Sequence, residues 1–164
     1  MKHCGTQRLE TERLILRRYK IDDAEAMFNN WASDDDVVKF LMWKPHESPE
    51  VSRGIIEEWI KRYSDGSYYH WAVVLKENGD EPIGDIAVVS AKEEISMAHI
   101  GYCIGKKWWH KGITSEALKA VMDYLFDAAD MNRIEARHDP RNVNSGKVML
   151  KCGMKYEGTL RSAD

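Results

Sequence analysis

Residues 98–129 of this 164-residue chain combine a strand-like run, a short basic turn and an amphipathic helix, and this succession limits the fold more than any other feature. The apolar residues of the helix fall at positions 117/118, 121/122 and 125/126, which is the spacing of one helix face. The turn, Trp108 to Ser115, contains a single glycine, Gly112. Unpaired backbone N–H groups and the positive end of the helix dipole meet at such a turn, so we predict a cradle for an anionic cofactor. The alternative is an ordinary strand-to-helix connection with Thr114 as N-cap.

Motifs and charge argue against several classes of protein. Neither G-x-x-x-x-G-K-S/T nor G-x-G-x-x-G occurs, so a P-loop nucleoside triphosphatase and a dinucleotide-binding fold lose their main support. The net charge of −3 argues against a general nucleic-acid binder, which usually carries a basic face. No apolar run approaches the roughly 20 residues of a membrane span, so we expect no membrane association. The six histidines are scattered without metal-ligand spacing, and we expect no metal.

The cysteines and the first residues indicate where the protein resides. Cys4, Cys103 and Cys152 are an odd number without a C-x-x-C pair, which is typical of reduced thiols. The first eight residues lack the apolar segment of a secretory signal. We therefore expect a cytoplasmic protein. Its length suits one domain, residues 1–164.

Strand and helix signals along the chain predict an α/β protein. Two strand-like runs, 69–75 and 83–89, are separated by the hairpin signal Asn78-Gly79. A strand at 95–104, a helix at 114–129 and a strand at 133–137 form a β-α-β unit. This order predicts a central twisted mixed sheet with helices on both faces. The other predicted elements are a strand at 14–17 and helices at 22–31 with Asp22 as N-cap, 35–41, 49–63, and 144–152 closed by Gly153.

Three groups of residues together resemble the GNAT N-acetyltransferases, specifically the RimJ/RimL-type ribosomal-protein N-terminal acetyltransferases. The groups are Thr11-Glu-Arg-Leu-Ile-Leu-Arg17, then Trp109-x-Lys-Gly-Ile-x-Ser-Glu-Ala117, then Asn142-x-x-Ser145 followed by Lys151-x-Gly-Met154. They occur in the order and spacing of that branch, and the resemblance covers nearly the whole chain. It implies the acyl-CoA N-acyltransferase fold and acetyl-CoA as co-substrate.

The resemblance also implies where acetyl-CoA binds. In the family, backbone amides of the turn hold the pyrophosphate, and Gly112 allows the backbone to come close. The preceding strand hydrogen-bonds the pantetheine arm, and Asn142 and Ser145 fall where the family contacts the arm and the thiol. The implied cofactor-binding residues are Tyr102, Cys103, Ile104, His110, Lys111, Gly112, Ile113, Thr114, Ser115, Asn142 and Ser145.

Two departures from the family pattern bear on function. Many members carry a tyrosine four residues after the position of Ser145, as the acid that protonates the departing thiolate, but this chain has Met149. Either Ser145 serves the thiolate, directly or through a water, or the thiolate leaves without help. The chain also ends at Asp164, where the resemblance implies one further strand. A truncated chain and a strand supplied by a partner are the alternatives, and an exposed sheet edge after residue 161 favours a homodimer.

The expected reaction is direct attack of a neutral amine on the thioester in a ternary complex. Alignment of two substrates contributes on the order of 7–11 kcal/mol in favourable systems. A backbone amide near Cys103 or Ile104 is the expected donor to the oxyanion. His99 is the preferred general base, because the branch often carries Glu at this strand position and imidazole accepts a proton near neutrality. The alternative is that His99 is only a half-exposed strand residue.

Other polar residues have a structural and a functional interpretation. Asp85, inside an otherwise apolar strand, either anchors the substrate ammonium or faces solvent. For His70 and His138 we favour ordinary strand-end roles over the lining of an acceptor cleft. We expect Cys103 and Cys152 to be small apolar residues rather than covalent acetyl carriers.

The leading hypothesis is an N-acetyltransferase acting on a primary amine, most readily a peptide or protein N-terminus such as that of a ribosomal protein. A second hypothesis keeps the chemistry and changes the acceptor to a polyamine, an amino acid or an antibiotic. A third is a non-catalytic acyl-CoA-binding module, supported by Met149 and by the missing carboxylate at His99.

Overall fold

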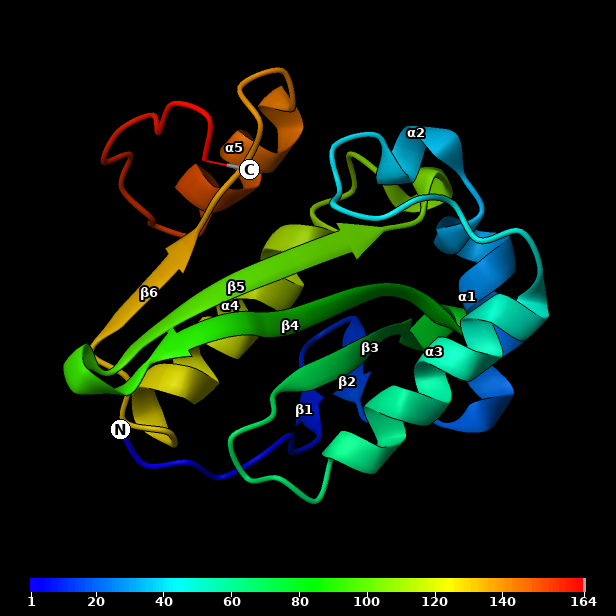
Figure 1. Cartoon of the computed structure of the whole chain (residues 1–164), viewed down its shortest axis with the longest axis horizontal. Helices are drawn as coiled ribbons and strands as arrows, with labels where there is room; N and C mark the ends of the chain where they lie inside the picture. Colours follow the sequence, from blue (N-terminus) through cyan, green and yellow to red (C-terminus); the bar gives the residue numbers. More distant parts are fainter. Residues whose placement is uncertain (164) are drawn as a thin grey trace.

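Six strands form the centre of the structure, a computed structural model that describes residues 1–163. They follow one another across the sheet in chain order. Neighbours from β1 to β5 run antiparallel, whereas β5 and β6 run parallel (Figure 1). The strands are β1 (Leu9–Glu10), β2 (Leu14–Arg17), β3 (His70–Leu75), β4 (Pro82–Lys92), β5 (Met97–Ile104) and β6 (Arg133–Ala136).

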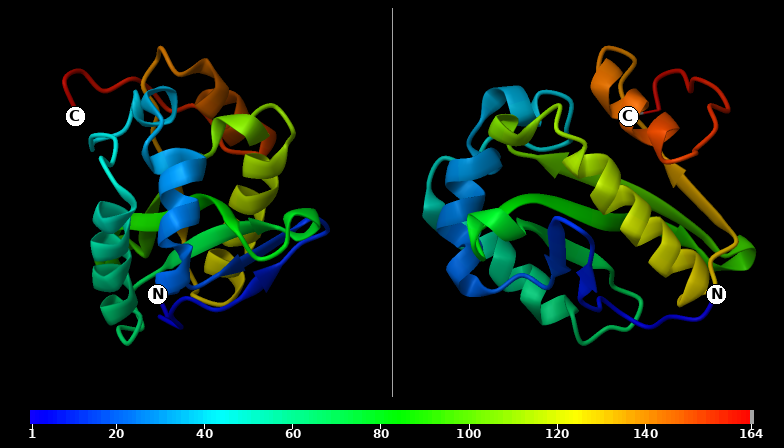
Figure 2. Two further views of the ribbon diagram at one scale, coloured as in Figure 1. Left: turned by 90° about the vertical axis from the view of Figure 1, so that its right-hand side faces the viewer. Right: turned by 180° about the vertical axis from the view of Figure 1, so that it is seen from behind.

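Helices cover both faces of this sheet, which confirms the predicted architecture. The long helix α4 (Ile113–Asp127) crosses one face, while α1 (Ala24–Met27) and α3 (Pro49–Arg62) cover the other (Figure 2). The two shorter helices are α2 (Asp35–Val38) and α5 (Val143–Lys151). No helix within residues 1–163 has the length and apolarity needed to cross a membrane.

The central strand β3 is buried along its whole length because both of its faces are covered. Trp71 and Val73 pack with Leu118 and Val121 of α4. Ala72, which points the other way, joins the second apolar cluster with the helices α1 and α3. Successive strand residues therefore supply two cores, and burial of each large apolar side chain contributes about 1.5–3 kcal/mol.

The predicted helix at 22–31 is divided into three pieces. A 3₁₀ turn (Ile21–Asp23) leads into α1, and a π turn (Phe28–Ala32) follows. The prediction that Asp22 caps this segment is wrong: Asp22 is exposed, and it is the Asp23 carboxylate that accepts a hydrogen bond from the Lys20 backbone N–H at 2.9 Å. Both aspartates are favourable residue types in the first turn of a helix. The ion pair with Arg17 on β2 turns Asp23, rather than Asp22, toward the sheet.

Other predicted boundaries moved by a few residues. The helix predicted at 35–41 ends at Val38, and the strand predicted at 83–89 extends over the whole of β4. Helix α5 has Cys152 as its C-cap, with Gly153 in the left-handed region just beyond it (φ +84°). Residues 152–163 contain no strand, and Asp164 lies outside the described residues.

Replacement of Asp23 by alanine tests the ion pair that holds the start of α1 on the sheet. Arg17 Nη1 and Nη2 donate to Asp23 Oδ2 and Oδ1, both at 2.8 Å, and the Asp23 side chain is only 2% exposed. We expect Asp23→Ala to lower the free energy of unfolding by about 3–5 kcal/mol, because it leaves a largely buried guanidinium without its main partner. Urea denaturation measures this loss. The exposed neighbour gives the control: Asp22→Ala should change stability by about 0.5 kcal/mol or less, and equal losses would contradict the assignment.

Candidate cofactor and acceptor site

The strands β5 and β6 part after four residue pairs. Their register runs from Met97 with Arg133 to Ile100 with Ala136, and beyond this point β5 pairs only with β4 (Figure 1). The segment 101–104 therefore has one open backbone edge. Such an edge offers N–H and C=O groups to an extended, amide-containing ligand. The predicted pantetheine-binding residues Tyr102, Cys103 and Ile104 lie in this segment.

The turn after β5 leads into α4 with two backbone reversals. His110 and Gly112 both adopt positive φ, +61° and +72°. Thr114, the N-cap in the alternative interpretation of this turn, does not cap the helix, because the left-handed conformation of Gly112 starts the helix two residues earlier and makes Gly112 the N-cap. Glycine has no side chain that could accept hydrogen bonds from the first N–H groups of the helix. Within residues 1–163, no N-cap side chain hydrogen-bonds the start of α4. The helix N-terminus is therefore open to an anionic ligand.

Two cations flank this turn. A Cβ atom built on Gly112 would lie 3.1 Å from Lys151 Nζ and 3.5 Å from Arg13 Nη2. Lys151 belongs to α5 and Arg13 to the segment before β2, so two distant parts of the chain add positive charge to the helix N-terminus. Sequence reasoning placed only the residues of the turn here. The one available signal was that Arg13 and Lys151 each lie in a motif of the resemblance.

An ion-pair network fixes the turn against the N-terminal segment. Arg13 Nη1 donates to the Lys111 carbonyl oxygen at 2.9 Å and Arg13 Nε to Glu116 Oε1 at 2.8 Å. Glu116 Oε2 accepts from the Thr11 hydroxyl at 2.6 Å and from the Arg13 backbone N–H at 3.0 Å. Partial burial raises the pKa of Glu116, but these hydrogen bonds outweigh it and hold the pKa below its usual value. The motif that begins at Thr11 thus supports the turn.

The hydroxyl of Tyr102 joins β5 to α5. It lies 3.0 Å from Ser145 Oγ and donates to the Ser145 carbonyl oxygen at 3.1 Å. Asn142 caps α5 through its side-chain oxygen, which accepts from the Ser145 N–H at 3.3 Å. Burial raises the pKa of Tyr102 to about 12. Three predicted cofactor residues are therefore brought together, although Tyr102 lies 43 positions before Ser145.

His99 and Asp85 lie on the opposite face of the sheet, the face of α1 and α3. His99 is partly buried and pairs in the ladders with Ser90 and Glu135. Asp85 pairs with Cys103, four residues further along β5. At roughly 3.3 Å per strand residue, His99 lies about 13 Å from Cys103. The structure therefore does not bring His99 and Asp85 together.

The remaining sequence candidates lie in separate places. His70 hydrogen-bonds Asp85, whereas His138 lies against α5, where a Cβ on Gly146 would be 2.8 Å from its Nε2. Burial, and then the charge of Asp85, raises the pKa of the Cys103 thiol well above its usual value, and burial raises that of Cys152. A thiol with a raised pKa is mostly protonated near neutral pH and is therefore a poor nucleophile.

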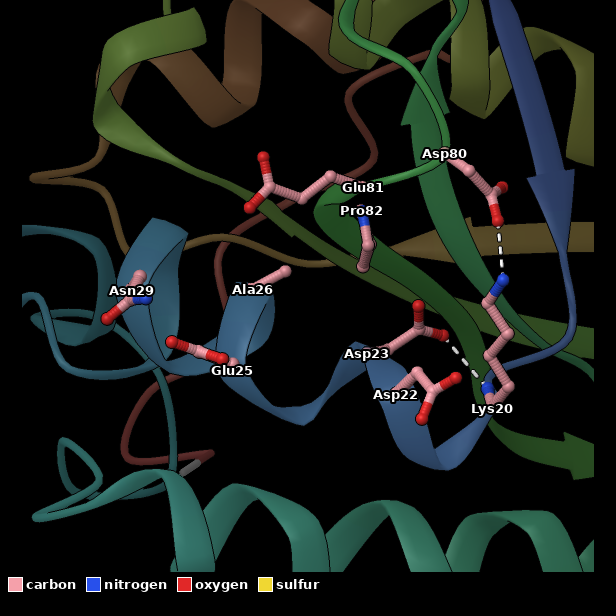
Figure 3. Close-up of a pocket in the computed structure, with 9 residues that line it drawn as sticks. All are labelled: Lys20, Asp22, Asp23, Glu25, Ala26, Asn29, Asp80, Glu81 and Pro82. Carbon is pink, nitrogen blue, oxygen red and sulfur yellow. Dashed lines mark hydrogen bonds and ion pairs between the residues drawn. The ribbon is translucent and has the colours of Figure 1, made fainter.

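A separate hollow of about 340 Å³ lies beside α1 and the turn before β4 (Figure 3). Two of its carboxylates are paired within the protein: Asp80 Oδ2 lies 2.5 Å from Lys20 Nζ, and Asp23 is bound by Arg17. The hollow contains none of the predicted site residues. It is lined by Lys20, Asp22, Asp23, Glu25, Ala26, Asn29, Asp80, Glu81 and Pro82.

Comparisons with known proteins agree with this geometry. Residues 13–155 match the model of a family described as the acetyltransferase (GNAT) domain. The uncharacterized N-acetyltransferase p20 of Bacillus licheniformis is 34% identical over 93% of this chain and 85% of its own. The ribosomal protein uS5-alanine N-acetyltransferase of Escherichia coli is 29% identical over 92% and 79%. The structure of RimL, a ribosomal L7/L12 alpha-N-protein acetyltransferase in complex with coenzyme A, superposes with a TM-score of 0.84 at 20% identity, covering 96% of this chain and 89% of that one.

Substitution of Gly112 tests the turn as the binding site for the phosphates of acetyl-CoA. A glutamate at position 112 would pair with Lys151 and place a negative charge where the phosphates are expected, at a cost of several kcal/mol. We expect Gly112→Glu to abolish the binding of acetyl-CoA measured by calorimetry.

Gly112→Ala is the matched control, because it adds only the roughly 1–2 kcal/mol of left-handed strain. It should lower the free energy of unfolding by about this amount and keep most of the affinity for acetyl-CoA. Failure of the intact protein to bind acetyl-CoA, or equal binding by both variants, would contradict the assignment.

Proposed function

Because this chain belongs to the GNAT family of acetyltransferases, we propose that it transfers the acetyl group of acetyl-CoA to the amine at the N-terminus of a peptide or protein. The observation that carries the proposal is the open edge of β5 leading directly to an uncapped helix N-terminus flanked by Lys151 and Arg13. An extended amide-containing arm that ends in phosphates fits this combination. The acceptor class is supported by the similarity to an enzyme that acetylates the alanine of ribosomal protein uS5.

The parts of the site suit successive parts of acetyl-CoA. The N–H groups of the turn, His110 to Ser115, with Lys151 and Arg13, bind the pyrophosphate. The open edge of β5 binds the pantetheine arm, and the amide of Cys103 or Ile104 donates to the thioester carbonyl oxygen. Trp109 Nε1 donates to the Ile104 carbonyl oxygen at 2.9 Å and so fixes the end of this edge.

Ser145 supports the departing thiolate by hydrogen bonding. Tyr102 donates its one hydroxyl proton to the Ser145 carbonyl oxygen, so the Ser145 hydroxyl supplies the proton of their 3.0 Å contact and can turn from Tyr102 to donate to sulfur. Net proton transfer from this pair is uphill, because the pKa of Tyr102 is raised to about 12 and that of an ordinary thiol is about 8.5. The pair therefore stabilises the thiolate while solvent supplies the proton. Tyr102 and Ser145 thus stabilise the departing thiolate, a role for which Met149 has no suitable group.

His99 acts as the general base of this reaction. Its separation of about 13 Å along the strand from Cys103 excludes direct contact with an amine at the thioester. A proton from the amine therefore reaches the imidazole only through intervening solvent molecules.

We also propose the binding order, the compartment and the assembly in which the reaction takes place. Both substrates bind before transfer, and no metal takes part. Cys4, Cys103 and Cys152 are free thiols, which suits a reducing cytoplasm. A homodimer is the expected assembly.

Steady-state acetylation of peptides tests the acceptor class. We expect peptides that begin with alanine or serine to be acetylated at the α-amine, as shown by mass spectrometry, while the same peptides with a blocked N-terminus remain unmodified. If only spermidine or free amino acids were acetylated, the acceptor would be a small amine and not a peptide N-terminus. Binding of acetyl-CoA without turnover on either group would indicate a binding module.

Replacement of His99 by alanine tests the base. The rate of the wild type should rise with pH as the base loses its proton, and His99→Ala should lower kcat and shift this pH-rate profile. His138→Ala is the matched histidine control and should keep the profile. An unchanged pH-rate profile in His99→Ala would remove His99 from the mechanism.

A further inference from the structure

A buried hydrogen-bonded network surrounds Asp85 on the α1 and α3 side of the sheet. Asp85 Oδ1 accepts two short hydrogen bonds, from the Tyr19 hydroxyl and from His70 Nε2, both at 2.5 Å. The Tyr68 hydroxyl lies 2.7 Å from His70 Nδ1. The Trp59 ring packs on both donors, with its centroid 4.2 Å from that of His70 and 4.9 Å from that of Tyr19. One oxygen of the carboxylate is thereby fixed in place.

The second oxygen of Asp85 has no such partner. Within residues 1–163, both hydrogen bonds to the carboxylate go to Oδ1, and no lysine or arginine forms an ion pair with it. The other well-buried carboxylates differ, since Asp23 is bound by Arg17 and Glu116 by Arg13. A largely buried carboxylate without a permanent cation is costly unless a partner compensates its charge.

Asp85 is accessible, whereas the groups behind it are enclosed. Its side chain is 20% exposed, compared with 7% for His70. Its ladder partner is Cys103, which belongs to the open segment of β5. Adjacent strands lie roughly 4.8 Å apart. A ligand on Asp85 therefore sits beside the backbone that is proposed to bind the thioester.

We propose that Asp85 Oδ2 binds the acceptor as a primary ammonium ion, and that Tyr19 and His70 are positioning residues that fix the carboxylate for it. This inference rests on the proposed function and adds the form in which the amine arrives. An ammonium ion supplies the missing positive charge and donates a charge-assisted hydrogen bond. The rings of Trp59 and Tyr19 belong to the same cluster, and aromatic rings attract nearby cations.

Tyr68 sets the tautomer of His70. A hydroxyl that donates to Nδ1 leaves the proton of the neutral imidazole on Nε2, where it points at Asp85. Burial raises the pKa of Tyr68 and of Tyr19 above their usual value, so both keep their protons. The network thus presents two donors to Oδ1 and leaves Oδ2 to the ligand.

Titration of the protein with propylammonium chloride, followed through the indole N–H resonance of Trp59, tests the inference without turnover. Trp59→Phe identifies the resonance. We expect a saturable shift with propylammonium and none with propan-1-ol, which has a similar shape and no charge. Asp85→Asn should weaken propylammonium binding roughly tenfold or more, because it removes the charge of the acceptor oxygen. Asp22→Asn, at an exposed site, should bind like the wild type.

Tyr19→Phe gives a second variant, which keeps the charge and removes one donor to Oδ1. It should weaken propylammonium binding by a smaller factor than Asp85→Asn. No saturable shift in the wild type, an equal response to propan-1-ol, or unchanged binding by Asp85→Asn would each overturn the inference. Acetylation of peptides is a separate measurement: its failure with normal propylammonium binding would contradict the proposed function and leave the ammonium site standing.

Discussion

The separation of β5 from β6 after Ile100 is the constraint on which the rest of the site depends. Parallel strands need a long crossover, and here α4 supplies it, so the turn that starts α4 stands at the end of β5. Because β6 pairs with β5 over only four residues, the edge of β5 that faces β6 is unpaired beyond Ile100. The proposed arm-binding edge and the proposed phosphate-binding turn therefore arise from one strand and its continuation.

Polar side chains from the first part of the chain hold this arrangement from both sides. Arg13 and Thr11 fix the turn at the start of α4, the proposed phosphate site, through Glu116 on the α4 face. On the other face, Arg17 fixes the start of α1 through Asp23, and Tyr19 follows two residues later to reach Asp85. A short stretch around β2 thus connects the cofactor side of the sheet to the proposed acceptor side.

Local patterns predicted the elements well and their contacts poorly. The spacing of apolar residues located β5, α4 and β6, because the period of a strand or helix is a property of neighbouring residues. Residue type alone suggested Asp22 as a cap, and Thr114 in the alternative interpretation of the turn, whereas the partner Arg17 and the backbone at Gly112 decided the outcome. The contact of Tyr19 with Asp85 spans 66 positions, and nothing in a local pattern encodes it.

The two cations beside Gly112 have a consequence for the stability of the whole molecule. Lys151 and Arg13 lie within a few ångströms of one position and repel each other, and the Glu116 carboxylate, which pairs with Arg13 at 2.8 Å, offsets part of this repulsion. A bound polyanion would turn that repulsion into attraction between α5 and the N-terminal segment. By linkage, a ligand at a hundred times its dissociation constant adds about 2.7 kcal/mol to the free energy of unfolding. A ligand bound at this turn would thus stabilise the fold as well as take part in the reaction.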